Sequence, residues 1–359
     1  MQTQSKELNF QGQNIYIGID THKKSWNVSI MTEVLTHKTF TQDPKPEILY
    51  AYLQKKFPGA TYYSAYEAGF CGFWIHHRLT SLGVKSIVVN PADIPTTNKE
   101  ILQKEDARDS RKIARGLING TLTPIHILPM KTMEDRSLVR TRSSLVRDMT
   151  RTKNRIKSFL SFYGIEFPDQ FSKSHTHWSK RFNLWLETIS GVENSGKDSL
   201  NALLDESKNL RASILDITKK IKALSKSDTY KENETLLRTV PGIGLLTAMT
   251  ILVELDDIKR FRNNDKLASY VGLIPSTFSS GEKEKIGDIT PRCNRTLRNA
   301  LIESAWIASR IDPALMRSYM EYCKTMEPNN AIIRIARKLL SRIRFVLMNK
   351  KAYELSKVE

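Results

Sequence analysis

The stretch Tyr16–Ile30, YIGIDTHKKSWNVSI, decides the fold of the first third of this chain. Its apolar run ends in Asp20, turns through polar residues and resumes as an alternation of apolar and polar residues. That pattern predicts two strands joined as a hairpin, with Asp20 close to the end of the first strand.

A second acidic residue has the same kind of position. The stretch Thr61–Glu67 is rich in β-prone residues and runs into a turn broken by glycine, so Glu67 is expected near a strand end. A helix-like segment follows at residues 73–82, and residues 84–90 form another predicted strand that Pro91 stops. These elements predict an α/β fold.

Two further acids, Asp106 and Asp109, lie three residues apart in the predicted helix 104–117, so both belong to one helix face. Four carboxylates at strand ends and on a helix suit Mg²⁺, or Mn²⁺, because these ions take oxygen ligands and substrate phosphates. Two such ions can clamp the attacking and leaving oxygens of an in-line phosphoryl displacement. The alternative is that the four residues are ordinary surface acids.

Motifs in both halves of the chain resemble one known family. In the N-terminal half they are residues 16–23 (YIGIDTHK), 67–69 (EAG), 90–91 (NP) and the Asp106/Asp109 pair. In the C-terminal half they are residues 240–248 (VPGIGLLTA), 261–270, 272–281 (GLIPSTFSSG) and 289–298 (ITPRCNRTLR). Together they resemble the DEDD transposases of insertion sequences and the related pilin-gene invertase, over residues 14–120 and 235–345.

The resemblance implies a ribonuclease H-like (RuvC-like) domain whose metal-binding residues are Asp20, Glu67, Asp106 and Asp109. It also implies that Ser280 attacks the scissile DNA phosphate, and that a structured non-coding bridge RNA guides the recombination of donor and target DNA. The chain departs from the family pattern at Pro291 and Cys293, where many relatives have Lys and Gly. These departures lie beyond Ser280, so they bear on DNA contacts more than on the nucleophile.

Ser280 is expected to form one composite site with the four carboxylates, within one subunit or across subunits. A serine hydroxyl is a weak nucleophile at neutral pH unless a base or a metal ion activates it. Two alternatives stay open from the residues alone. Ser280 can be a turn residue chosen for its place before Gly281, and the neighbouring Ser279 can be the nucleophile instead.

The charge of the chain indicates a polyanionic partner. It holds 56 Lys and Arg against 38 Asp and Glu, a formal net charge of +18, and residues 1–120 account for only 15 of the basic residues and 11 of the acidic ones. The densest basic stretch has Asp148 as its single acid and predicts an amphipathic helix that binds nucleic acid, the guide RNA in particular. The alternative is a solvated charged face. Its basic residues are Arg136, Arg140, Arg142, Arg147, Arg151, Lys153, Arg155 and Lys157.

Two further segments are expected to contact DNA. The run Val240–Gly244 resembles a helix-hairpin-helix turn, so Gly242 and Gly244 are expected where backbone N–H groups face a phosphate. The basic residues that follow Ser280 are expected to hold the DNA backbone at the cut. They are Lys283, Lys285, Arg292, Arg295 and Arg298.

The expected organisation begins with a flexible N-terminus (1–13) and a catalytic domain (14–125). A helical coiled-coil region for dimerisation and RNA binding follows at 126–234, with an aromatic-rich insertion at about 164–197, because apolar residues recur at helical spacing in residues 200–224. A mainly α-helical C-terminal transposase domain (235–350) and a tail (351–359) complete the chain.

The remaining features narrow the function classes. No stretch is long and apolar enough to cross a membrane and residues 1–14 lack a signal-peptide pattern, so a cytoplasmic protein of a bacterial or archaeal cell, nucleoid-associated when active, is expected. Strand exchange needs several active sites, which predicts a dimer that assembles into a tetramer on nucleic acid. Two rival functions stay open: a metal-dependent Holliday-junction resolvase-like nuclease or invertase that reads DNA without RNA, and a nucleic-acid-binding protein without catalysis.

Overall fold

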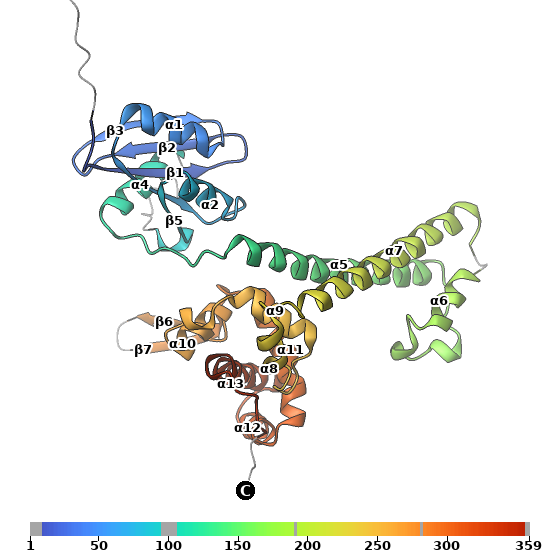
Figure 1. The fold of residues 1–359 in the computed structure, drawn as a ribbon. Coiled ribbons are helices and arrows are strands. Elements are labelled where there is room, and N and C mark those ends of the chain that lie inside the picture. The colour runs from blue at the N-terminus through green and yellow to red at the C-terminus, as the bar shows by residue number, and fades with distance from the viewer. Residues whose placement is uncertain (1–8, 95–105, 190–191, 281–282, 356–359) are drawn as a thin grey trace, which may run out of the picture. The chain divides into compact units, whose positions relative to one another are not determined.

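The computed structural model describes residues 9–94, 106–189, 192–280 and 283–355; the side chains of residues 106–107, 277–280 and 283–286 lie outside the description. The chain divides into two compact units, Met1–Pro129 and Met130–Glu359 (Figure 1). This division falls near the predicted end of the catalytic domain at residue 125. The predicted boundary between residues 234 and 235 falls inside the second unit and stays a prediction.

The first unit is built on a five-stranded mixed sheet with the spatial order β3-β2-β1-β4-β5. The strands are β1 (Asn14–Thr21), β2 (Trp26–Met31), β3 (Thr36–Gln42), β4 (Thr61–Glu67) and β5 (Lys85–Val89). The first three form an antiparallel meander, whereas β4 is parallel to β1 and β5 is parallel to β4. The predicted α/β class of this half is confirmed, and the predicted hairpin is β1 and β2.

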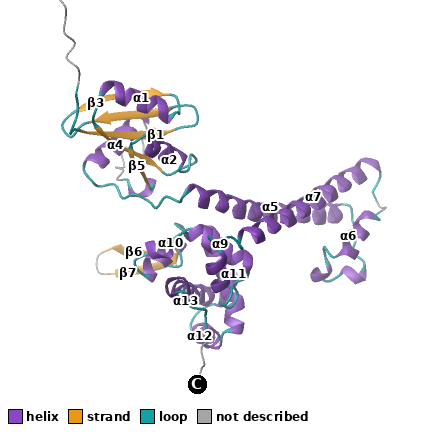
Figure 2. Cartoon of the chain, viewed as in Figure 1, coloured by secondary structure: helices purple, strands orange, loops and turns teal. Residues whose placement is uncertain are grey.

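Helices cover both faces of this sheet (Figure 2). Helices α1 (Pro46–Lys56) and α2 (Trp74–Ser81) pack on the face where alternate residues of β1, such as Ile17 and Ile19, are fully buried. Helix α4 (Asp106–Ile118) packs on the other face through Ile113, against Ala65 and Val89. A short 3₁₀ turn, Pro91–Asp93, follows β5.

The second unit begins with two long helices, α5 (Met130–Phe162) and α7 (Asn194–Leu224), which lie side by side (Figure 1). The insertion between them holds 3₁₀ turns Asp169–Phe171 and Ser174–Thr176 and helix α6 (Lys180–Glu187). Phe171 and Phe182 of the insertion form a buried core with Ile156 of α5 and Leu204 of α7. The aromatic residues of the predicted insertion therefore cap this helix pair.

The rest of the second unit is mainly helical, as predicted, and shares one hydrophobic core. That core also includes Val139 of α5 and Ile221 of α7, so the long helices are anchored in it. The elements of this part of the second unit are α8 (Lys231–Leu237), α9 (Leu245–Leu255), the 3₁₀ turn Ile258–Arg260, α10 (Asn264–Val271), β6 (Pro275–Ser280), β7 (Lys283–Ile289), α11 (Arg295–Ile311), α12 (Pro313–Cys323) and α13 (Pro328–Asn349). Among the helices of the described ranges, none has the length and apolar character needed to cross a membrane.

Candidate functional site

Asp20 and Glu67 lie at the carboxyl ends of two neighbouring parallel strands. The register of β1 and β4 pairs Ile19 with Tyr66, so Asp20 and Glu67 are each one residue further along their strands. Both residues are half-buried, and Asp20 Oδ2 lies 3.2 Å from Nε2 of His22. Both acids therefore lie near strand ends, as predicted. Because β1 and β4 are parallel, these two ends meet at the same edge of the sheet.

Gly18 explains why α4 lies close to this edge. A Cβ atom at residue 18 would be 2.0 Å from the carbonyl oxygen of Ser110, a distance that no side chain can tolerate. The helix backbone thus packs directly on β1, and Ser110 Oγ also lies 2.8 Å from Oγ of Ser29, in a buried hydrogen bond. A glycine at this position is therefore a condition for the approach of α4.

The same packing assigns the strand-end acids to the face that α4 covers. Residues of a strand alternate between faces, so Asp20 shares the face of Gly18, and Glu67 shares the face of Ala65, which packs against α4. Asp109 precedes Ser110 on that helix, and Asp106 begins it. Three members of the predicted tetrad therefore belong to one side of the sheet, while the side chain of Asp106 lies outside the description.

The carboxylates fit a divalent metal by their chemistry, since they supply only oxygen ligands. Within the described side chains, however, the structure holds no group of three or more His, Cys, Asp or Glu residues placed to bind a metal ion. Asp20, Glu67 and Asp109 do not make a closed cage by themselves. The predicted tetrad stays a prediction.

Ser280 ends strand β6 in a β-hairpin of the second unit. The register pairs Ser280 with Lys283 and Ser279 with Glu284, so residues 281 and 282 connect the strands. Alternate residues of a strand belong to opposite faces, which assigns Ser280 and Ser279 to different faces. The side chains of Ser280, Lys283 and Lys285 lie outside the description, as does Gly281.

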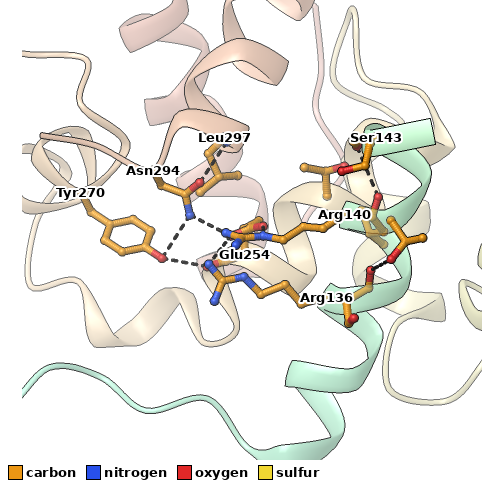
Figure 3. A network of polar contacts seen from close by, with 12 residues as sticks. Arg136, Arg140, Ser143, Glu254, Tyr270, Asn294 and Leu297 are labelled. Carbon is orange, nitrogen blue, oxygen red and sulfur yellow. Dashed lines mark hydrogen bonds and ion pairs between the residues drawn. The ribbon is translucent and has the colours of Figure 1, made fainter. Parts of the chain in front are cut away.

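A buried carboxylate that sequence reasoning missed, Glu254 of α9, organises the centre of the second unit (Figure 3). Its oxygens accept hydrogen bonds from Arg140 at 2.6 and 2.9 Å and from Nδ2 of Asn294 at 2.8 Å, and Arg136 forms an ion pair with it at 2.8 Å. Tyr270 Oη donates to its backbone carbonyl at 3.1 Å. These contacts join α5, α9, α10 and the start of α11.

The arginine pair holds the pKa of Glu254 below its usual range. Burial is the largest single influence and by itself raises that pKa, but hydrogen bonds and positive charge from Arg140 and Arg136, with a hydrogen bond from Asn294, outweigh it. Glu254 therefore stays ionised inside the core. The sequence signal was available, because Glu254 is the one charged residue of the helix Leu245–Leu255.

This network changes the interpretation of the basic helix. Although Asp148 is the single acid within the basic stretch, Arg136 and Arg140 have an acidic partner, Glu254, from a distant segment. Other cations of α5 also have partners: Arg142 donates to Thr218 at 2.7 Å, Arg151 pairs with Asp148 at 2.9 Å, and Arg155 lies 3.8 Å from Glu206. Arg147 donates to Ser144 of its own helix at 2.9 Å, so contact of these residues with nucleic acid stays a prediction.

The glycines of the turn before α9 have separate roles. Gly242 has a φ of +82°, and a Cβ there would be 2.3 Å from the carbonyl oxygen of Ser304 on α11, so packing requires this glycine. Gly244 caps the start of α9, is exposed, and a Cβ there would meet nothing within 4 Å. Of these two glycines, only Gly244 has open space beside it, at the start of α9.

The basic residues after the hairpin also differ from one another in their contacts and exposure. Arg298 donates to the carbonyl oxygen of Thr290 and lies over Gly272, so it fixes the segment between β7 and α11. Arg292 and Arg295 are exposed on the same segment. Asn294 caps α11 by accepting from the N–H of Leu297, in addition to its bond with Glu254. Contact of Arg292, Arg295 and Arg298 with DNA stays a prediction.

Two family models match this chain. One, described as a transposase of the DEDD type from IS110, matches residues 17–165. The other, described as a transposase of the IS116/IS110/IS902 family, matches residues 234–321. The first match covers β1 to β5 and α4, and the second covers the segment from Glu254 to the Ser280 hairpin and Asn294.

Curated relatives agree with these models. The chain is 27% identical to a transposase for insertion sequence element IS1533 of Leptospira borgpetersenii, over 81% of this chain and 84% of the relative. It is 28% identical to the transposase for IS1111A of Coxiella burnetii, over 66% of this chain and 63% of that relative. It is 35% identical to an insertion element IS110 protein of Streptomyces coelicolor, over 33% of this chain and 30% of that relative.

A mixed sheet with acids at adjoining strand ends, followed by a helical unit, is consistent with the DEDD class of transposases. Within this class both family models and the relatives are similar to this chain as IS110-type transposases.

Proposed function

We propose that this protein is the transposase of an insertion sequence, and that it cuts and rejoins DNA through a covalent phosphoserine intermediate. One observation carries the proposal. Asp20 and Glu67 end neighbouring parallel strands on the sheet face against which α4, the helix of Asp106 and Asp109, packs. We further propose that the first unit has the ribonuclease H-like (RuvC-like) fold.

The four carboxylates would hold Mg²⁺ or Mn²⁺. Their oxygen-only donor set fits such ions, and DEDD transposases are generally metal-dependent. When bound, the ions would polarise the scissile phosphate and make a coordinated hydroxyl easier to deprotonate. The residues of this chain hold the ions and so place the phosphate for attack.

Ser280 would supply the nucleophile. Its hydroxyl loses a proton to a base, the Oγ–P bond forms, and the bond from phosphorus to the leaving strand oxygen breaks, leaving that oxygen to take a proton. Attack of a hydroxyl of another strand on the same phosphorus breaks the Oγ–P bond and restores the serine. Each step exchanges one phosphate ester for another, so joining needs no ATP.

The serine is tested by replacing each of two adjacent hydroxyls. With Ser280→Ala we expect loss of both strand joining and any protein–DNA adduct that survives SDS. Ser279→Ala is the matched control, since Ser279 belongs to the opposite face of the hairpin, and it should retain both. Joining at the wild-type rate by Ser280→Ala would contradict the proposal, and loss in Ser279→Ala alone would move the nucleophile by one residue.

The metal site is tested separately. Asp109→Asn, and EDTA added to the wild type, should each abolish cleavage while DNA binding measured by fluorescence anisotropy persists. Added Mg²⁺ or Mn²⁺ should restore the chelated wild type but not the variant. Cleavage that withstands both treatments would rule out the metal role, whereas a wild type that binds but never cuts would indicate a binding protein.

We also propose that a structured guide RNA binds the second unit. Residues 121–359 hold 41 basic and 27 acidic residues, which supports a polyanionic ligand there. Sequencing the RNA that co-purifies from the native host should yield one enriched RNA encoded beside the gene. A random RNA population would favour the second candidate, an invertase or Holliday-junction resolvase-like nuclease that reads DNA directly.

The assembly belongs to the same proposal. Cutting both strands of two duplexes requires several active sites, so a dimer should assemble into a tetramer on nucleic acid. Analytical ultracentrifugation with RNA and both DNAs measures this. A monomer on all three ligands would contradict it.

A further inference from the structure

A cavity of 330 Å³ lies where α5 and α7 meet the insertion that joins them. This volume is within the range of pockets that hold small ligands. Lys153 of α5, Arg211 of α7 and Trp178 of the insertion line it, and none of them belongs to the proposed catalytic machinery. The cavity thus requires an explanation of its own.

The walls of the cavity are largely apolar and include one aromatic ring. Met149, Leu204 and Leu215 line it together with Trp178. Trp178 has a φ of 67°, a left-handed conformation that a bulky residue adopts only where the surrounding structure compels it. Its ring packs against Phe182, with centroids 5.3 Å apart. The fold therefore holds a flat ring at the wall, which suits stacking of a planar group.

Positive charge exceeds negative charge at the same place, where Lys153, Lys208 and Arg211 line the cavity together with one acid, Glu187. Lys153 Nζ lies over the Trp178 ring, 5.0 Å from its centre, in a cation–π contact, so a base that stacks on this ring face takes the place of the ammonium group. Burial and then the charges of Arg211 and Lys157 lower the pKa of Lys153. The ion pairs of the described part of the chain include none made by Lys153, Lys157 or Arg211, whereas Lys208 on the rim is paired with Glu187 at 2.9 Å. An anion bound here would relieve this repulsion.

We propose that the cavity receives one unpaired nucleotide of an RNA strand, with its base stacked on Trp178 and its phosphate held by Lys153 and Arg211. A planar base and an adjacent phosphate match the flat apolar wall and the two cations, Lys153 and Arg211, that have no ion pair among the described residues. Paired bases of a duplex are stacked inside it, whereas bases of RNA loops are splayed out and stack on aromatic side chains. The inference rests on the proposed RNA partner and gives that RNA a defined contact.

The test uses the purified full-length protein and a single-stranded RNA of roughly twelve nucleotides, within the usual range of site sizes, carrying 4-thiouridine for photocrosslinking. The crosslink should map to the peptide that contains Trp178. Trp178→Ala should weaken binding about tenfold, as expected for loss of one stacked base, and Trp178→Phe should recover most of it.

Two more variants separate binding from folding. Trp178→Ala can disturb the aromatic core, but Arg211 is exposed, so Arg211→Gln leaves the packing intact and should still weaken RNA binding about tenfold, as for a lost charged contact. Lys219→Gln removes an equal charge from the same helix outside the cavity and should change affinity by less than about twofold.

Each other result has a separate meaning. If the wild type binds this RNA but Trp178→Ala and Arg211→Gln bind equally well and crosslinks map elsewhere, the cavity assignment is wrong and the RNA partner stands. If the wild type binds no RNA, the RNA partner itself is wrong. Equal binding of the matching DNA strand through the same crosslink would overturn the choice of RNA.

Discussion

At Glu254, one buried carboxylate balances two guanidinium groups and an amide. Glu254→Gln removes the charge and leaves Arg136 and Arg140 facing each other without a counterion. Arg136 and Arg140 are partly exposed, so solvent screens the charges left behind, and we expect a loss of about 1–3 kcal/mol in the second unit, as for removal of charged hydrogen bonds. Urea denaturation of the full chain followed by circular dichroism measures it.

A matched control is Glu321→Gln, which removes an equal charge from an exposed pair with Lys324. Solvent screens that pair, so little change in the urea midpoint is expected. A Glu254→Gln protein as stable as this control would mean that the arginines find other partners.

Glu254 also predicts how stability responds to acid. Its pKa is lowered in the folded protein, so its contribution is complete above the usual Glu pKa of about 4.3 and is lost as pH falls through the folded value. The pKa of Asp312 is lowered in the same way. Burial raises this pKa, but hydrogen bonds from Tyr353 and Leu315 and the charge of Arg342 together lower it by more. The urea midpoint should therefore drop below about pH 4 in the wild type and drop less in Glu254→Gln.

The place of a residue in the fold could be predicted from the sequence where it depended only on the position of that residue along its own strand or helix. Asp20 and Glu67 were located correctly because an apolar run with a defined end shows where a strand stops. Arg136 and Arg140 were interpreted from their own helix alone, and their partner Glu254 is 114 residues from Arg140. Local charge counting cannot detect such a pair.

At the scale of elements, the approach of α4 to β1 depends on the absence of one side chain. Gly18→Ala places a methyl group against the Ser110 carbonyl, so the helix must move away from Asp20. We expect a loss of about 1–3 kcal/mol, the usual effect of overpacking, together with loss of DNA cleavage. Thermal unfolding and a cleavage assay measure the two effects.

Gly69→Ala is the control for stability, because a Cβ at that position meets nothing within 4 Å. Its unfolding midpoint should stay at the wild-type value. If Gly18→Ala also unfolds at the wild-type temperature, the contact between α4 and β1 is looser than the structure indicates.

Element types followed from pattern, but their packing did not. The amphipathic basic stretch from Arg136 to Lys157 predicted α5, and the repeat of residues 200–224 predicted α7. The insertion between them lacks a repeat because its aromatic residues pack in several directions around Phe182. A periodic sequence pattern indicates that a helix has one apolar face, but it does not indicate an aromatic cluster whose members pack in several directions.

At the scale of the whole molecule, most of the excess positive charge lies beyond residue 120. Binding of nucleic acid should therefore weaken steeply with salt, by about a thousandfold between 50 and 200 mM if six phosphates are neutralised. Asp20→Asn should show the same salt dependence as the wild type, since Asp20 belongs to the first unit. Fluorescence anisotropy across a salt series measures both, and a flat response would contradict a phosphate-dominated interface.

The first family match spans most of the first unit and continues through α5 of the second unit, whereas the second match lies wholly in the second unit. Motifs identified the class because each half carries its own signature. They could not show which cations remain uncompensated, since that depends on contacts between helices remote in sequence, such as those around Lys153 and Arg211.

The length of α5 sets a spacing along any strand that follows it. At 33 residues its axis is about 50 Å long, and the thirteen residues from Arg140 to Lys153 span about 20 Å. A strand anchored at the Trp178 cavity and running along the helix would come level with the Glu254 network about 20 Å away, a separation that the continuous helix keeps constant.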